Sequence, residues 1–291
     1  MDPMLWVALF SAFCRGGVNL IDRYLLGMKT KDLFLNALFN VTLPFLLCLV
    51  ISLIFFPVQN FLDLFLQPGP WIFALAIQLA SYSFSFAFKH MEITRVMILS
   101  KIGEVLIPLC LLPITGAWSE REYLFYAASL LAFCPLFIRN GNFFKHIPWI
   151  SLITIAFAIN FQAVVFVFLP KDGGIQTVEA FWLLNNAILG CRVVYSFIPL
   201  LFKAKHPALW MAEVMATMNI PMTLLRTFAF LFTQGAFLLA LGQPHSYLTW
   251  PILNCTPLIA SLGGYFILKE ELRKSEISAL CLLTAVLIWI K

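Results

Sequence analysis

The sequence contains little charge for its length. Asp, Glu, Lys and Arg together make up 11% of the 291 residues, whereas roughly 25% is usual in a soluble domain. Hydrophobic residues make up 62%, and phenylalanine alone occurs 30 times. A water-soluble fold of this size has no interior large enough to hide so much apolar surface, so part of its solvent must be lipid. We therefore expect an all-α membrane protein.

The sequence also lacks the motifs of several other classes of protein. The net charge of +5 is scattered, without a Lys/Arg-rich run, so a nucleic acid is not expected as a partner. The seven cysteines form no CxxC pair and the four histidines are isolated, so we expect no disulfide framework, metal or cofactor. No glycine-rich phosphate loop and no DxxxD, HxxxxD or GxSxG motif occurs. This excludes ATP-driven transport by the chain alone and leaves a membrane-embedded enzyme without a catalytic motif.

Apolar runs long enough to cross a bilayer occur along the whole chain. A membrane-spanning helix needs about 20 predominantly apolar residues, and turn signals such as QPGP and RNGN separate the runs. The first run lacks the basic segment of a signal peptide, so we expect it to be a membrane helix. Ten helices are expected in one membrane domain, 1–291, with approximate spans 4–25, 33–56, 70–89, 94–115, 120–138, 147–169, 176–202, 219–241, 246–268 and 274–290.

The segment 206–221 follows the seventh expected span. It is expected to be an interfacial helix or the start of the eighth span. The ten helices divide into halves of five, 1–138 and 139–291, and an odd number makes the halves cross the membrane in opposite directions as inverted repeats. Shifting the chain by 153 residues sets 104–133 against 257–286 without a gap and places Lys101 opposite Asn254.

The positions of the basic residues predict an orientation. Most Lys and Arg residues between the expected helices lie in odd-numbered loops, with Arg23, Lys29, Arg95 and Lys269 as examples. Loops rich in Lys and Arg tend to stay in the cytoplasm. The charges therefore favour cytoplasmic odd loops, with both termini on the other side of the membrane.

The last third of the chain follows a pattern of its own. Pro257 stands in the middle of an apolar run, small residues follow it, and the turn KEEL at Lys269–Leu272 precedes a final helix. This pattern resembles the end of an EamA-type member of the drug/metabolite transporter superfamily. The first half has the same layout, but TGAW replaces the acidic turn, and Lys101 and Glu104 are not typical.

The resemblance implies a ten-helix transporter built from inverted repeats, with a central cavity and alternating access. It implies no particular substrate, because the superfamily carries amino acids, nucleotide sugars, phosphorylated metabolites, drugs and lipid-linked sugars. Most members have both termini in the cytoplasm, which is opposite to the orientation that the loop charges favour. We therefore leave the orientation open.

Charged residues inside the expected spans are the main functional signal. A charge at bilayer depth costs at least ~2.5 kcal/mol, so it is expected to face a cavity or a partner. In the first span, Arg15, Asn19 and Asp22 follow at i, i+4 and i+7 and share one face. Arg15 could pair with Asp22 through Asn19 or a water molecule, whereas Asp22 and Arg23 could instead lie at the membrane interface.

Lys101 and Glu104 stand three residues apart in the middle of the fourth span. At this spacing they can neutralise each other on one helix face. One interpretation is a structural ion pair that orients the helix. The other is a site for substrate or a proton, because a carboxylate in a medium of low dielectric constant binds protons more readily. Asp22 is the second candidate for proton coupling.

Three later spans carry further candidates. Asn185 and Arg192 share a face of the seventh span. Arg226 stands near the start of the eighth span, where its side chain could also extend to the interface. Trp250 and Asn254 lie in the ninth span, where an aromatic side chain is more often a packing residue than a ligand platform.

Positive charge exceeds negative charge inside the spans. Four cations face only two acids, Asp22 and Glu104, and an apolar interior would not tolerate the surplus unless an anion arrives. Arginine matches carboxylate and phosphate through its fork of donors. The expected substrate-binding residues are Arg15, Asn19, Lys101, Glu104, Asn185, Arg192, Arg226, Trp250 and Asn254.

These observations predict a secondary active transporter in the cell (inner or plasma) membrane. It would move a small anionic or zwitterionic metabolite by alternating access, as a proton-coupled carrier or an exchanger. Its expected partners are that small molecule and the lipid bilayer, and it would act as a monomer or a homodimer. The alternatives are a membrane-embedded enzyme and a structural or assembly subunit without transport.

Overall fold

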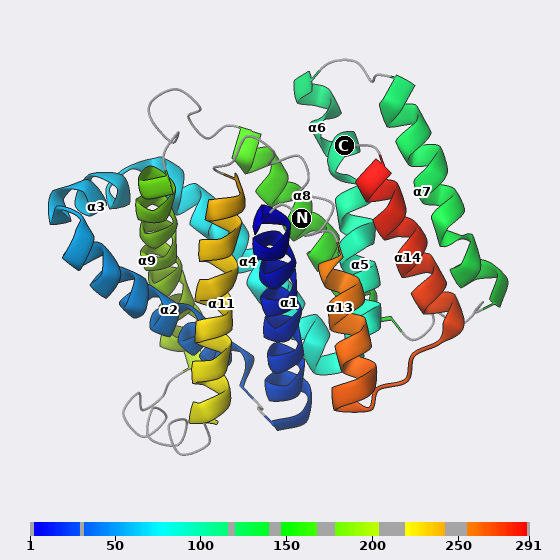
Figure 1. The fold of residues 1–291 in the computed structure, drawn as a ribbon, viewed down its shortest axis with the longest axis horizontal. Coiled ribbons are helices and arrows are strands. Elements are labelled where there is room, and N and C mark those ends of the chain that lie inside the picture. Colours follow the sequence, from blue (N-terminus) through cyan, green and yellow to red (C-terminus); the bar gives the residue numbers. More distant parts are fainter. Residues whose placement is uncertain are drawn as a thin grey trace.

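The computed structural model of the protein is a bundle of helices packed side by side (Figure 1). It describes residues 3–29, 32–115, 120–139, 147–167, 178–203, 219–241 and 255–289, and these contain no β-strand. The helices are α1 (Pro3–Arg23), η1 (Tyr24–Lys29), α2 (Leu33–Phe55), α3 (Val58–Phe65), α4 (Pro68–His90), α5 (Ile93–Val105), α6 (Ile107–Thr115), α7 (Glu120–Arg139), α8 (Trp149–Val167), α9 (Val178–Lys203), α11 (Ile220–Leu241), α13 (Thr256–Gly263), η4 (Gly264–Leu268) and α14 (Lys274–Trp289).

The outer surface of the bundle is apolar. Large side chains such as Phe55, Leu66 and Phe202 are 71%, 78% and 89% exposed, and such a surface needs apolar surroundings. Four helical stretches are long and apolar enough to cross a membrane. We therefore describe the chain as a helical membrane protein. The four stretches are Leu33–Phe55, Pro68–His90, Ile93–Ile114 and Trp182–Phe202.

Capping and proline residues set several helix boundaries. The Asp32 carboxylate accepts a hydrogen bond of 3.1 Å from the first turn of α2 and caps that helix. Pro68 opens α4, where its missing N–H costs nothing. Pro108 has no backbone N–H and so cannot form a helical hydrogen bond to the preceding turn. Near this point the backbone N–H of Leu106 bonds to the Gly103 carbonyl, three residues before it, at 3.2 Å. The expected single span 94–115 is therefore two helices, α5 and α6.

The described helices lie at the expected positions, with three further differences. The first span is longer than expected, because α1 continues as the π-helical segment η1. The short helix α3 follows the second span and was not expected. The ninth span is described only from residue 255, as α13 and η4. Most of the segment 206–221 lies outside the described residues.

Helix α1 is at the centre of the packing. It lies between α11 and α13 (Figure 1), while α4 and α5 both pack against α8. Two glycines allow close approach: a Cβ on Gly16 of α1 would lie 2.8 Å from Ile259 of α13, and a Cβ on Gly103 of α5 would lie 2.9 Å from Ile159 of α8. These contacts bring polar side chains of α1 within reach of neighbouring helices.

The bundle has two distinct ends. Helix α1 runs into η1, α4 gives way to α5, and α13 runs into η4 at one end, which is the lower end in Figure 1. Helix α1 begins and α14 finishes at the opposite end. We call the first of these the η1 end.

Candidate functional site

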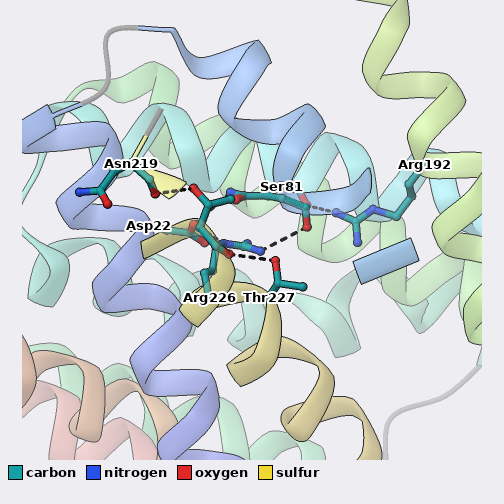
Figure 2. A network of polar contacts seen from close by, with 8 residues as sticks. Asp22, Ser81, Arg192, Asn219, Arg226 and Thr227 are labelled. Carbon is teal, nitrogen blue, oxygen red and sulfur yellow. Dashed lines mark hydrogen bonds and ion pairs between the residues drawn. The ribbon is translucent and has the colours of Figure 1, made fainter. Parts of the chain in front are cut away.

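Arg226 of α11 forms a two-pronged ion pair with Asp22 of α1. Its Nε donates to Asp22 Oδ1 at 2.5 Å and its Nη2 donates to Oδ2 at 2.9 Å. The Asn40 carbonyl of α2 accepts from Arg226 Nη1 at 3.2 Å, and Asn40 Nδ2 donates to Asp22 Oδ1 at 3.1 Å. Arg226 is only 9% exposed, so the alternative that its side chain extends to the interface is wrong. The pair, drawn in Figure 2, neutralises both charges and joins three helices.

Lys101 and Glu104 pair within α5. Lys101 is 2% exposed, and its Nζ donates to Glu104 Oε2 at 2.7 Å. Ser100 Oγ donates to the other carboxylate oxygen at 3.4 Å. The expectation that these neighbours neutralise each other is confirmed.

Arg192 of α9 is buried without a carboxylate. Its Nε donates to Gln78 Oε1 at 3.1 Å and its Nη2 donates to Ser81 Oγ at 2.6 Å, both on α4 (Figure 2 shows Ser81). Within the described residues, no Asp or Glu lies at ion-pair distance from it. The nearby positive charge of Arg226 repels it. These neutral partners accept from Nε and Nη2 but leave a buried charge uncompensated, which is costly unless an anion is near.

Arg15 of α1 also has no ion pair within the described part of the chain. Its side chain is exposed, yet it stands two and a half turns after the lipid-facing Trp6 and therefore lies on the opposite side of the helix. Ala8 and Ser11, on the same side as Arg15, are fully buried. Arg15 therefore lies on the side of α1 that packs into the bundle, where Glu104 attracts it electrostatically.

The structure brings some predicted site residues together and separates others. The expected pairing of Arg15 with Asp22 through Asn19 is wrong, because Asp22 pairs across helices with Arg226, and Asn19 Nδ2 lies 3.8 Å from the sulfur of Met97. These contacts were beyond reach of helical spacing within one span.

The remaining candidates lie apart from these contacts. Asn185 lies two turns before Arg192 on α9, and its amide nitrogen is buried without a hydrogen-bond partner among the described residues. Trp250 and Asn254 lie outside the described residues. Asp22 and Glu104 each carry a cation partner, and a proton-coupling role stays a prediction for both.

The sequence indicated Gln78 only as a polar group able to hydrogen-bond between helices, which its bond to Arg192 confirms, and it did not indicate Ser81 or Asn40 as partners of the cations. Gln78 and Ser81 stand three residues apart on α4, and this spacing, which places two polar groups on one face of an apolar run, was the available signal. Asn40 carried a similar signal, because Asn36 stands four residues before it on the same face of α2, but its contacts with α1 and α11 depend on the packing.

Comparison with known proteins adds no family. No model of a known protein family matches the chain, and no curated protein is similar enough to count as a relative.

Proposed function

We propose that the protein is a secondary active transporter that moves a small anionic or zwitterionic metabolite across the cell membrane by alternating access. One observation carries this proposal. Arg226 pairs with Asp22 and Lys101 pairs with Glu104, and two further cations inside the bundle have no acidic partner among the described residues. These are Arg192, whose partners in the described part of the chain are neutral, and Arg15, which lies on the side of α1 that packs into the bundle.

The groups beside Arg192 favour an anion over a zwitterion. Gln78 Nε2 and the Tyr82 hydroxyl are buried and make no hydrogen bond of good geometry among the described residues, although Tyr82 interacts with Gln78 and Ser196. Both stand on α4, and Tyr82 interacts electrostatically with Arg192. A zwitterion would also need a carboxylate for its ammonium group, but Asp22 and Glu104 are already paired. A carboxylate or phosphate would accept from the arginine fork and these donors.

The packing of the helices supports the proposed inverted repeats. If α1, α2, α4, α5 and α7 correspond to α8, α9, α11, α13 and α14, the most extensive helix contacts of one half have counterparts in the other. Helix α1 packs on α11 and α13, as α8 packs on α4 and α5, and α2 and α7 pack on their own counterparts, α9 and α14. The glycine contacts of Gly16 with α13 and Gly103 with α8 also correspond. Such an exchange of partners is expected of two repeats related by a two-fold axis.

The alternatives account less well for the unpaired charges. An assembly subunit would pair its buried charges internally, as Asp22 with Arg226 does, but Arg192 has no acidic partner among the described residues. An enzyme would need a nucleophile with its base or a pair of acids at the site, and the described contacts of Arg192 are with an amide and a hydroxyl.

Reconstitution tests the proposal directly. The purified protein is placed in liposomes, and uptake of labelled carboxylates, phosphates, amino acids and neutral sugars is followed with and without a pH gradient. We expect saturable uptake of at least one anion and none of the neutral sugars. Replacing Arg192→Gln should abolish that uptake while the protein still purifies as a folded species.

A matched variant separates charge from folding. Arg273→Gln also removes an arginine, but one that lies at the surface and pairs with the exposed Glu271, so it should leave the anion selectivity intact. Transport that is unchanged in Arg192→Gln, or no transport of any anion by the wild type, would overturn the proposal.

A further inference from the structure

Ion pairs hold the helices together at the η1 end. Arg23 Nε donates to Glu270 Oε1 at 2.5 Å, and Arg23 Nη1 donates to the Phe88 carbonyl at 2.5 Å. The other oxygen of Glu270 accepts from the backbone N–H of Ile93 at 2.8 Å. Two side chains thus connect α1, α4, α5 and the turn after η4.

A second cluster lies beside the first. Arg95 stands between two carboxylates, with Nε 3.2 Å from Glu276 Oε1 and Nη2 3.4 Å from Glu92 Oε2. Glu276, in the first turn of α14, is fully buried, and Glu92 precedes α5 and is partly buried. This cluster connects the start of α5 with the start of α14.

The two clusters together hold one carboxylate too many. Arg23 and Arg95 face Glu92, Glu270 and Glu276, and the only other acid near Glu92 in the described chain is Glu271, which is exposed and lies 3.8 Å from Arg273. The second oxygen of Glu276 and Glu92 Oε2 are both buried without a hydrogen-bond donor among the described residues. A proton would supply the missing donor and remove the excess charge.

The electrostatics of Glu92 agree with this geometry. Burial raises the pKa of Glu92, the negative charges of Glu276, Glu270 and Glu271 raise it further, and Arg95 opposes the rise. In an open and hydrated end, Glu92 would return toward an ordinary pKa of about 4.3.

Two irregular segments mark where this end can move. The π-helical segments η1 and η4 directly adjoin Arg23 and Glu270, the partners of the first ion pair. After η4 the chain turns at Lys269 with a φ of 60°, a left-handed conformation. π-helical segments inside helices are frequent at functional sites.

We propose that Glu92 and Glu276 share a proton-binding site that holds the η1 end closed. This inference rests on the proposed transport function, for which a closed end is one half of alternating access. The closed end binds the proton more tightly than an open end does, so acid favours the closed state. That advantage is complete below the ordinary pKa of glutamate and is lost as the pH rises through the raised pKa of the closed state.

Distance measurements across this end test the site without substrate. Spin labels are attached through His90→Cys at the end of α4 and Lys274→Cys at the start of α14, both exposed positions, in the full chain with its seven native cysteines replaced. We expect one short distance at pH 5 and a growing population of longer distances as the pH rises to 9.

Glutamine variants assign the response to the cluster. Glu92→Gln supplies the missing donor without a charge and uses a side chain that makes no helix-capping bond, so the short distance should persist at every pH. Glu276→Gln should behave alike and serves if the first variant fails to fold. The control Glu271→Gln, at the neighbouring exposed acid, should respond like the wild type. The proposed proton-binding site would be wrong if the distance between the labels in the wild type does not change with pH. It would also be wrong if both cluster variants respond to pH as fully as the wild type. Absent transport with an intact pH response would overturn only the proposed function.

Discussion

Arg226 and Arg192 are both 9% exposed, yet their surroundings differ. Arg226 shares two hydrogen bonds with the Asp22 carboxylate, whereas the side-chain partners of Arg192 in the described part of the chain are an amide and a hydroxyl. A buried arginine with its own acid is a fixed connection between helices. One without an acid remains able to bind an anion. The same residue type thus serves structure at one position and recognition at the other.

The largest expected effect comes from removing the acid of the paired arginine. Asp22→Asn leaves Arg226 buried without a counter-charge, and breaking such a pair costs about 3–5 kcal/mol of folding stability. Thermal unfolding in detergent should show a clear fall in the midpoint. The exchange Asp22→Arg with Arg226→Asp restores opposite charges and should recover part of the loss. An unchanged midpoint in Asp22→Asn would show that the pair is not structural.

Arg192→Gln should weaken anion binding and should not lower the folding stability. Binding of the anion should weaken by about 2–5 kcal/mol, which corresponds to roughly 30-fold to several thousand-fold. Stability should be equal or higher, because an uncompensated buried charge is removed. Equilibrium binding and thermal unfolding are measured on the same preparations. A fall in stability as large as that of Asp22→Asn would remove the distinction between the two arginines.

Ser81→Ala tests the contribution of a neutral partner of Arg192. It removes the hydrogen bond of 2.6 Å to Arg192 Nη2, and hydrogen bonds to charged groups contribute about 1.5–3 kcal/mol. We expect weaker anion binding by that amount, because the guanidinium is less well positioned. Ser83→Ala is the matched control, since Ser83 Oγ bonds only to the Leu79 carbonyl within its own helix. Equal affinities for the two variants would argue against a positioning role for Ser81.

The smallest effect is expected at an exposed ion pair. Glu271 and Arg273 lie 3.8 Å apart with side chains 75% and 39% exposed, so solvent screens their attraction and the pair contributes about 0–1 kcal/mol. Glu271→Gln should therefore leave the unfolding midpoint nearly unchanged. A drop comparable with that of Asp22→Asn would mean that burial does not decide the strength of these pairs.

Local spacing made part of the site predictable. Lys101 and Glu104 are three residues apart on one helix, so their pairing follows from helical geometry. Asp22 and Arg226 come from α1 and α11, and nothing in the sequence indicates which faces of these helices meet. The surplus of positive charge followed from composition. Its assignment to Arg15 and Arg192 required the packing.

The helices were predictable for a similar reason. Long apolar runs bounded by turn residues indicate membrane helices without tertiary information. The break between α5 and α6 also had a local cause, Pro108. The extension of α1 into η1 did not, because it lies where Arg23 bonds to Glu270 and to the Phe88 carbonyl, partners distant in sequence.

The central claim is that Arg192 carries a charge that an anion neutralises. The most direct measurement titrates purified wild-type protein and Arg192→Gln with succinate, inorganic phosphate and glucose, and follows the unfolding midpoint. A ligand that binds the folded state raises the midpoint in a concentration-dependent manner. We predict a saturable rise with at least one of the two anions in the wild type, none with glucose, and none with any ligand in Arg192→Gln. An equal rise in both proteins, or no rise with either anion, would contradict the account.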